Sequence, residues 1–120
     1  LLECYVNLKR EMETYMKYLD AWDKKVAIWG ASHQGFTLAA TTKLGEKARY
    51  IIDSAPFKQG KFAPASHLPI VGPDHFHEHP VDAIIITAPG YTDEIAASIR
   101  QKFGTAVEIR AMRSNHLEMV

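Results

Sequence analysis

A short apolar run that ends at a glycine constrains the fold of this chain more than any other feature. Residues 26–29 (VAIW) lead directly into the loop 30–35 (GASHQG). Such continuous apolar runs are typical of strands buried on both faces, as in a parallel sheet. Residues 35–44 then have the pattern of a helix that Gly45 should end, and residues 48–53 form a second apolar run. The order strand, loop, helix, strand predicts a βαβ unit.

The rest of the chain continues this alternation with weaker signals. Pro69 makes residues 68–71 a candidate edge strand, because proline cannot donate to a central ladder. The other expected elements are at most one helical turn at 74–78, a strand at 82–87, a helix at 92–103 capped by Thr92 or Asp93, and a strand at 106–110. The sequence therefore predicts an α/β chain, a Rossmann-like three-layer sandwich with a mainly parallel sheet. We expect the core to span 25–110 and a tail without clear period to follow at 111–120.

A long amphipathic helix is predicted before this core, over residues 1–22. Its apolar residues are spaced alternately by four and three: Leu1, Tyr5, Leu8, Met12, Tyr15, Leu19 and Trp22. The spacing is compatible with a dimerising coiled coil. Aromatic residues in so short a seam favour packing on the chain's own sheet or on a neighbouring domain.

Length and composition restrict the class of protein. The 120 residues are enough for one domain, and the formal net charge of zero offers no basic excess for binding DNA or RNA. No apolar run approaches the roughly 20 residues needed to span a membrane. A single cysteine, Cys4, is compatible with the reducing cytoplasm. Because the chain starts without Met in what looks like the middle of a helix, we expect it to be part of a longer protein.

The loop 30–35 has the character of an anion site. A strand that enters a helix through glycines presents backbone N–H groups and a positive helix end. Gly30 and Gly35 match the first and third glycines of the dinucleotide fingerprint G-x-G-x-x-G. Ser32 stands in place of the second glycine, whose role in the fingerprint is to let the backbone approach a pyrophosphate closely. Asp53 follows Gly30 by 23 residues, close to the spacing of a ribose-binding acid. Asp53 either contacts a ligand or caps the following turn.

Histidines supply two further candidates. His33 lies in the loop, where it could reach a phosphate, carry a proton or cap the helix. His75, His77 and His79 alternate and would share one face of a strand, as in a metal site, but a solvated surface turn is favoured before Pro80. No nucleophile elbow, Cys–His pair or carboxylate pair is evident. The residues therefore favour a binding domain over a complete enzyme.

Several segments resemble one known family. These are residues 26–35 (VAIWGASHQG), 50–62 (YIIDSAPFKQGKF), 64–71 (PASHLPIV) and 87–91 (TAPGY), the last followed by Glu94. They resemble the C-terminal domain of the S-adenosylmethionine-dependent sugar-nucleotide C-methyltransferases. The chain departs from the family pattern where Ser54-Ala55 follows the acid instead of Asn-Pro, and where Pro89-Gly90 replaces Trp-Asn.

The resemblance implies a division of labour. A separate N-terminal domain of the longer protein would bind S-adenosylmethionine, and the catalytic base would lie outside this segment. This chain would carry no cofactor, metal or catalytic residue, and would help to enclose a nucleotide-diphosphate-linked keto-deoxyhexose. The expected partners are that nucleotide sugar and the missing methyltransferase domain, with no nucleic acid and no membrane.

The expected substrate-binding residues lie in the first loop, after the second strand and at the start of the last helix: Gly30, Ser32, His33, Gly35, Asp53, Lys58, Tyr91 and Glu94. Lys58 is either a cation for phosphate or a solvated loop lysine, and Glu94 either a ligand contact or a favourable first-turn charge. Three alternatives remain: an NAD(P)-binding domain of an oxidoreductase, the N-terminal domain of a sugar-nucleotide acyltransferase, or a purely structural, oligomerising module.

Overall fold

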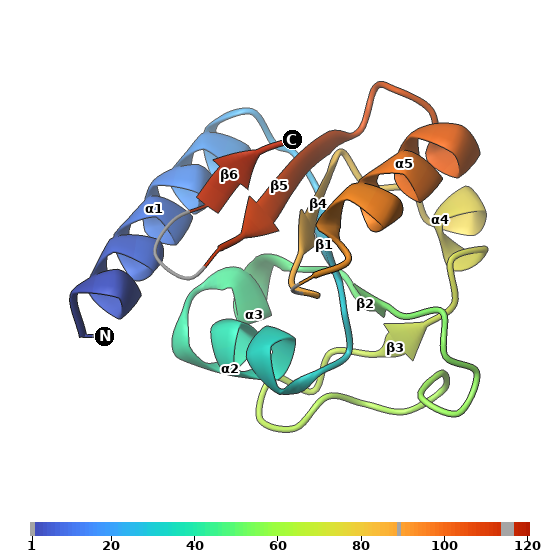
Figure 1. The fold of residues 1–120 in the computed structure, drawn as a ribbon, viewed down its shortest axis with the longest axis horizontal. Coiled ribbons are helices and arrows are strands. Elements are labelled where there is room, and N and C mark those ends of the chain that lie inside the picture. The colour runs from blue at the N-terminus through green and yellow to red at the C-terminus, as the bar shows by residue number, and fades with distance from the viewer. Residues whose placement is uncertain (1, 89, 114–116) are drawn as a thin grey trace.

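All five strands expected from the apolar runs are present, and they lie side by side in one sheet (Figure 1). The computed structural model describes residues 2–88, 90–113 and 117–120, and their side chains from Val6 onward. Leu1, Pro89 and residues 114–116 of the expected tail lie outside the described residues. The strands are β1 (Val26–Trp29), β2 (Ile51–Ile52), β3 (Ile70–Val71), β4 (Ala83–Ile86), β5 (Glu108–Met112) and β6 (Leu117–Met119).

The strand order is β3-β2-β1-β4-β5-β6, parallel up to β5 and antiparallel at β6. In register, Ile28 faces Ile51 on one side and Ile85 on the other. The order reverses between β1 and β4, which are neighbours in space although β2 and β3 separate them in the chain. Such a reversal is the topological switch point where open α/β sheets bind ligands, at the carboxyl ends of the strands.

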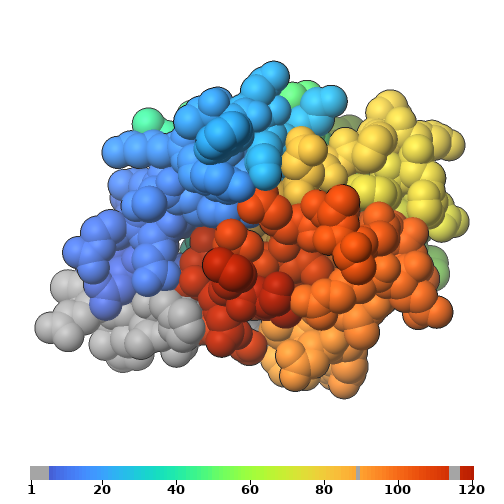
Figure 2. All heavy atoms as spheres, turned by 90° about the horizontal axis from the view of Figure 1, so that it is seen from above, coloured from blue at the N-terminus to red at the C-terminus, as the bar shows by residue number. Residues whose placement is uncertain are grey.

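Helices cover both faces of the sheet, so the expected three-layer Rossmann-like architecture is confirmed. The helices are α1 (Leu2–Ala21), α2 (His33–Thr41) and α3 (Leu44–Lys47) on one face, and α4 (His75–Glu78) and α5 (Thr92–Phe103) on the other. Figure 2 shows the C-terminal strand at the surface between α1 and α5. No helix in the described part of the chain is both long and apolar enough to cross a membrane.

The long helix α1 packs on the chain's own sheet, as the aromatic seam favoured. Met12 and Leu19 are fully buried in the same cluster as Ile28 of β1. Two details of the expected stripe are wrong. Trp22 lies beyond the end of α1 and is 69% exposed, whereas Met16, which was not part of the stripe, is buried. Burial of both residues 15 and 16 shows that the contact stripe is broader than a two-residue coiled-coil seam.

The helix after the first loop ends earlier than expected, and Gly45 does not end it. Thr42 has extended backbone, and its hydroxyl donates to the carbonyl of Leu38 at 2.6 Å and accepts the Leu44 N–H at 3.2 Å. These bonds replace helical ones and start α3 as a separate turn. Gly45 lies inside α3, where a Cβ would collide with the carbonyl oxygen of Ala39. The glycine therefore permits close packing of α3 on α2.

Three smaller expectations also need correction. The residue at the N-cap of α5 is Tyr91 instead of Thr92 or Asp93, and it makes no side-chain capping bond. β5 begins at Glu108, two residues later than expected, because its register on β4 starts with the pair Ala83 and Glu108 and continues to Ile86 and Ala111. The expected tail contains β6, which is too short to show a period and is stabilised by pairing with β5.

Candidate functional site

The two glycines of the first loop, Gly30 and Gly35, serve the packing of the loop on the end of β4. Gly30 has a φ of +130°, and a Cβ there would lie 2.6 Å from the hydroxyl oxygen of Thr87. A Cβ on Gly35 would collide with the Gly30 carbonyl and lie 2.8 Å from the same hydroxyl. Thr87 is itself buried and donates to the carbonyl oxygens of Trp29 and Gly30, at 3.3 and 3.2 Å. The glycines thus allow Thr87 to bind the loop to the sheet.

Ser32 and His33 lie at the start of α2, on the outer side of the loop. Ser32 is half-buried at the N-cap, and its carbonyl accepts the Phe36 N–H at 2.9 Å, while its side chain makes no capping bond. His33 is the first residue of the helix and is exposed. Both side chains remain available to a ligand that lies over the helix N-terminus.

Asp53, at the carboxyl end of β2, holds two backbone segments together. Its Oδ2 accepts the Ala31 N–H and its Oδ1 accepts the Ala55 N–H, each at 2.9 Å. Lys58 Nζ lies 3.7 Å from Oδ2 and donates to the carbonyl of Ala31 at 3.0 Å. The carboxylate is 16% exposed. We call Asp53, Lys58 and the Ala31 peptide the clasp, because together they bind the first loop to the segment after β2.

The block Lys58-Gln59-Gly60, for which a generic dinucleotide fold has no need, extends the clasp. The Gln59 side chain donates to the carbonyl of Asp53 at 2.9 Å, and a Cβ on Gly72 would lie only 3.1 Å from it. The Gly60 N–H donates to a carbonyl of β3 at 2.9 Å. These contacts fold the β2–β3 connection back onto both strands, which gives the block a structural role beside any contact with a ligand.

A hollow of about 460 Å³ lies at the switch point, between the strand ends and the first turns of α5. Its described lining residues lie at the end of β1, in the segments that follow β1, β2 and β4, and in the first turns of α5: Trp29, Gly30, Asp53, Ser54, Ala88, Tyr91, Glu94, Ile95 and Ser98. Four of the eight expected site residues, Gly30, Asp53, Tyr91 and Glu94, therefore meet in one place. Ser32, His33, Gly35 and Lys58 are not among the described residues that line the hollow, so the expected site divides into two parts.

The segment after β3 forms the predicted single helical turn, α4, which includes His75 and His77 and has His79 at its C-cap. His75 packs edge-on against Tyr50 and beside His79, with ring centroids 4.7 Å apart in both pairs. His77 is exposed and contacts Phe103 edge-on at 5.7 Å. Among the described residues, no group of three or more His, Cys, Asp or Glu side chains could hold a metal ion.

A second polar cluster, at the amino end of β5, was not anticipated. Glu108 accepts the Tyr18 hydroxyl at 2.8 Å and Lys24 Nζ at 3.0 Å, with Arg110 3.8 Å away. Burial acts to raise the pKa of Glu108, but the hydrogen bonds from Tyr18 and Lys24 outweigh it and hold that pKa below its ordinary value. Burial also raises the pKa of Tyr15, which stacks on Tyr18. The cluster connects α1 to β5, which are far apart in the sequence. It lies at the amino end of β5, whereas the hollow lies at the carboxyl ends of the strands.

Comparison with known proteins identifies the chain's relatives. The family model described as the C-methyltransferase C-terminal domain matches residues 4–108. The chain belongs to this family. The C-methyltransferase NovU of Streptomyces niveus is 37% identical over 90 residues, which are 74% of this chain and 21% of that protein. The matched part thus spans about a fifth of the relative's length.

The similarity to a solved structure concerns the fold alone. The crystal structure of UDP-D-quinovosamine 4-dehydrogenase from Vibrio fischeri superposes with a TM-score of 0.62 over 81% of this chain and 93% of that one. Sequence identity is 19%, so the comparison supports the Rossmann-type architecture and carries no activity over to this chain.

Proposed function

We propose that this domain is the nucleotide-sugar-binding part of a C-methyltransferase that acts on nucleotide-diphosphate-linked keto-deoxyhexoses. Membership of the C-methyltransferase C-terminal domain family supports the class of enzyme. The observation that carries the proposal is the position of the hollow, at the switch point where Rossmann-type sheets bind nucleotides. The partners in this proposal are the nucleotide sugar and a methyltransferase domain of the longer protein, both in the cytoplasm.

S-adenosylmethionine is the methyl donor that the family implies, and the first loop fits it poorly. Ser32 is half-buried where a glycine would leave room for a ligand. Lys58 pairs with Asp53 and the loop carbonyl instead of standing free for the methionyl carboxylate. We therefore assign the donor to the other domain. The residues here would bind and orient the acceptor sugar, and methyl transfer itself would occur elsewhere.

In this proposal the N-terminus of α2 and the hollow beside α5 bind different portions of the same ligand. The N-terminus of α2, with Ser32 and His33, offers N–H groups, a hydroxyl and an imidazole to the phosphates. The hollow beside α5 receives another portion of the same molecule. Lys58 uses one of its three ammonium N–H groups for the Ala31 carbonyl and could offer another to a phosphate, and a Lys58→Met variant tests this contribution.

Titration with nucleotide sugars tests the proposal directly. TDP-glucose and UDP-glucose are added to the isotope-labelled chain while the amide resonances of Gly30, Ser32 and Asp53 are followed. Saturable shifts at these amides are expected. We further expect Ser32→Ala to weaken binding about threefold to tenfold, since it removes one hydrogen bond. The control Ser66→Ala changes a half-buried loop serine elsewhere and should leave binding unchanged. Amide resonances that stay still with both ligands would disprove the proposed function.

A further inference from the structure

The charges around the hollow limit which part of a ligand can occupy it. Asp53 and Glu94 contribute two carboxylates, and no Lys, Arg or His is among the described residues that line it. The nearby cation, Lys58, is turned toward Ala31 and contacts Oδ2 of Asp53 at 3.7 Å. A diphosphate inside the hollow would therefore face two negative charges without a cation of its own to offset them.

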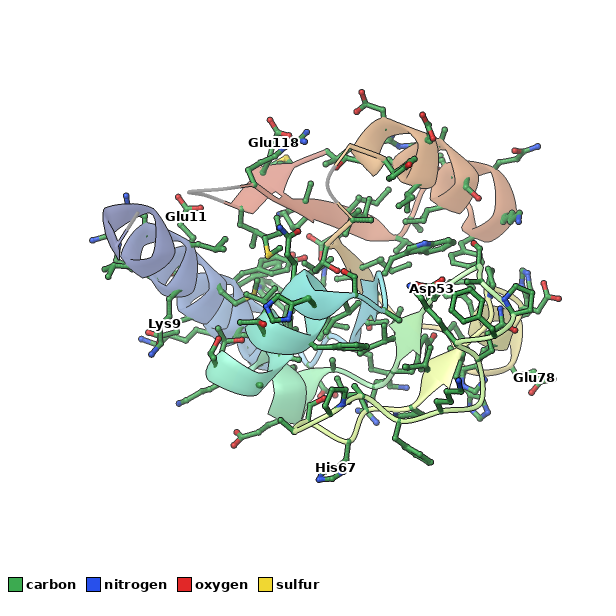
Figure 3. The ribbon with its side chains drawn as sticks, turned by 60° about the horizontal axis from the view of Figure 1, so that its bottom comes forward. Lys9, Glu11, Asp53, His67, Glu78 and Glu118 are labelled. Carbon is green, nitrogen blue, oxygen red and sulfur yellow. The ribbon has the colours of Figure 1, made fainter. Side chains whose placement is uncertain are left out.

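The same carboxylates suit hydroxyl groups. An ionised carboxylate has about four lone-pair positions, and the two N–H groups bound to Asp53 occupy two of them. The remaining positions can accept hydroxyl protons from a ligand in the hollow. Glu94 is exposed on the first turn of α5, and both of its oxygens can accept in the same way. Figure 3 shows Asp53 at the end of β2, on the side toward α5.

The remaining lining groups suit the faces of a ring. The Trp29 side chain is buried and forms an apolar floor together with Ile95. Tyr91 also lines the hollow and is 61% exposed, so its ring is accessible to a ligand there. Aromatic faces stack on bases and on the apolar faces of sugars, whereas carboxylates accept the hydroxyls at the ring edge.

We propose that the hollow receives an uncharged, hydroxyl-bearing ring, and that the diphosphate of the same ligand lies outside it. This inference rests on the proposed function and deepens it, because it orients the nucleotide sugar on the domain. The pyranose and the nucleoside both have the required chemistry, so the experiment must distinguish these two sources. In either orientation the phosphates lie toward the N-terminus of α2, which is outside the hollow.

The test uses separate pieces of the ligand and the labelled chain. Thymidine, methyl glucopyranoside, inorganic pyrophosphate and TDP-glucose are titrated in turn, and the amides of Ser54, Glu94 and Ser98 report on the hollow. We expect TDP-glucose and one neutral ring to shift these amides, and pyrophosphate to leave them unchanged. A response to thymidine would assign the hollow to the nucleoside, and a response to the glycoside would assign it to the sugar.

A charge-neutral variant adds an independent readout. Glu94→Gln should weaken binding of the responding neutral ring about fivefold, because an amide is a poorer acceptor than a carboxylate. Glu78→Gln changes an exposed glutamate outside the hollow and is the matched control.

Failure of the inference and failure of the proposed function give different results. The inference is overturned if pyrophosphate shifts the hollow amides as strongly as TDP-glucose does, or if TDP-glucose shifts only the amides of Ser32 and His33. In both cases the nucleotide sugar still binds, and the proposed function stands. Absence of any shift with TDP-glucose would instead overturn the proposed function.

Discussion

The two sides of the sheet's carboxyl edge use similar polar residues in opposite ways. Beside β2, Asp53 is 16% exposed, accepts two backbone N–H groups and pairs with Lys58. Beside α5, Glu94 and Tyr91 are exposed and project from the first turn of a helix. Residues that looked equivalent as site candidates thus differ in their surroundings. The clasp residues bond to the chain's own backbone, whereas Glu94 and Tyr91 on the α5 side are open to solvent.

Substitution of Gly30 should give the largest loss of stability. Gly30→Ala combines a positive φ with a Cβ 2.6 Å from Thr87 Oγ1, and we expect the free energy of unfolding to fall by about 3–5 kcal/mol. Chemical denaturation measures this loss. Gly104→Ala is the control, since its φ is +91° but a Cβ there meets nothing within 4 Å, and it should cost about 1–2 kcal/mol. Equal losses would show that Thr87 does not confine the loop.

Removal of the Asp53 carboxylate should have the next largest effect. Asp53→Ala leaves the N–H groups of Ala31 and Ala55 without their acceptor, and we expect a loss of about 2–4 kcal/mol in unfolding free energy. Lys58→Met retains both of those bonds and should cost only about 1 kcal/mol. If Asp53→Ala were as stable as the wild type while binding of TDP-glucose was lost, the carboxylate would belong to the ligand-binding side of the comparison.

Glu108 is a paired carboxylate that lies away from the carboxyl edge of the sheet. It therefore tests whether pairing alone makes a carboxylate contribute to stability. Its pKa is lowered in the folded state, so its stabilising contribution is present above the ordinary value of 4.5 and is lost as pH falls through the lowered value. Glu108→Gln should therefore cost about 1 kcal/mol at pH 7 and less in acid, where the wild-type carboxylate is protonated. Unfolding curves measured between pH 7 and pH 3 check this. A loss independent of pH would contradict it.

The exposed side of the edge should show the smallest effect on stability. We expect Glu94→Gln and Tyr91→Ala to change the unfolding free energy by less than about 0.5 kcal/mol, because both side chains are exposed. The same two variants should weaken binding of TDP-glucose in the titration. Thermal melts and titrations on the same samples separate the two quantities. A large loss of stability in either variant would remove the contrast between the two sides.

Local patterns in the sequence anticipated most of the fold. The apolar run of β1, the glycines around it and the proline before β3 each indicate an element from neighbouring residues alone. The ends of the helices were harder to predict. Thr42 ends α2 through its own hydrogen bonds, and Gly45 is needed for close packing against Ala39 instead of ending a helix. The strand β6 could not be anticipated, since three residues show no period and their pairing depends on β5.

The eight candidate site residues were predicted as one group. In the folded chain, four of them line the hollow and the other four are not among its described lining residues. Gly30, Asp53, Tyr91 and Glu94 were predicted as site residues because each follows a strand or opens a helix, and the topology brings them to one hollow. Thr87 was missed as a residue that holds the loop, although a threonine that ends an apolar run is a signal in the sequence that could have been used.

The sequence by itself determined the class of this protein through a βαβ pattern, a glycine loop with Ser32 in place of a glycine, and segments that resemble the C-methyltransferase family, to which the chain belongs. Only the tertiary structure decided what the polar residues do. The bonds from the Ala31 N–H to Asp53 and from the Thr87 hydroxyl to Gly30 join residues 22 and 57 positions apart. Spacing can bring a carboxylate to the correct edge of a sheet, but the bonds it forms there depend on which distant backbone groups fold against it.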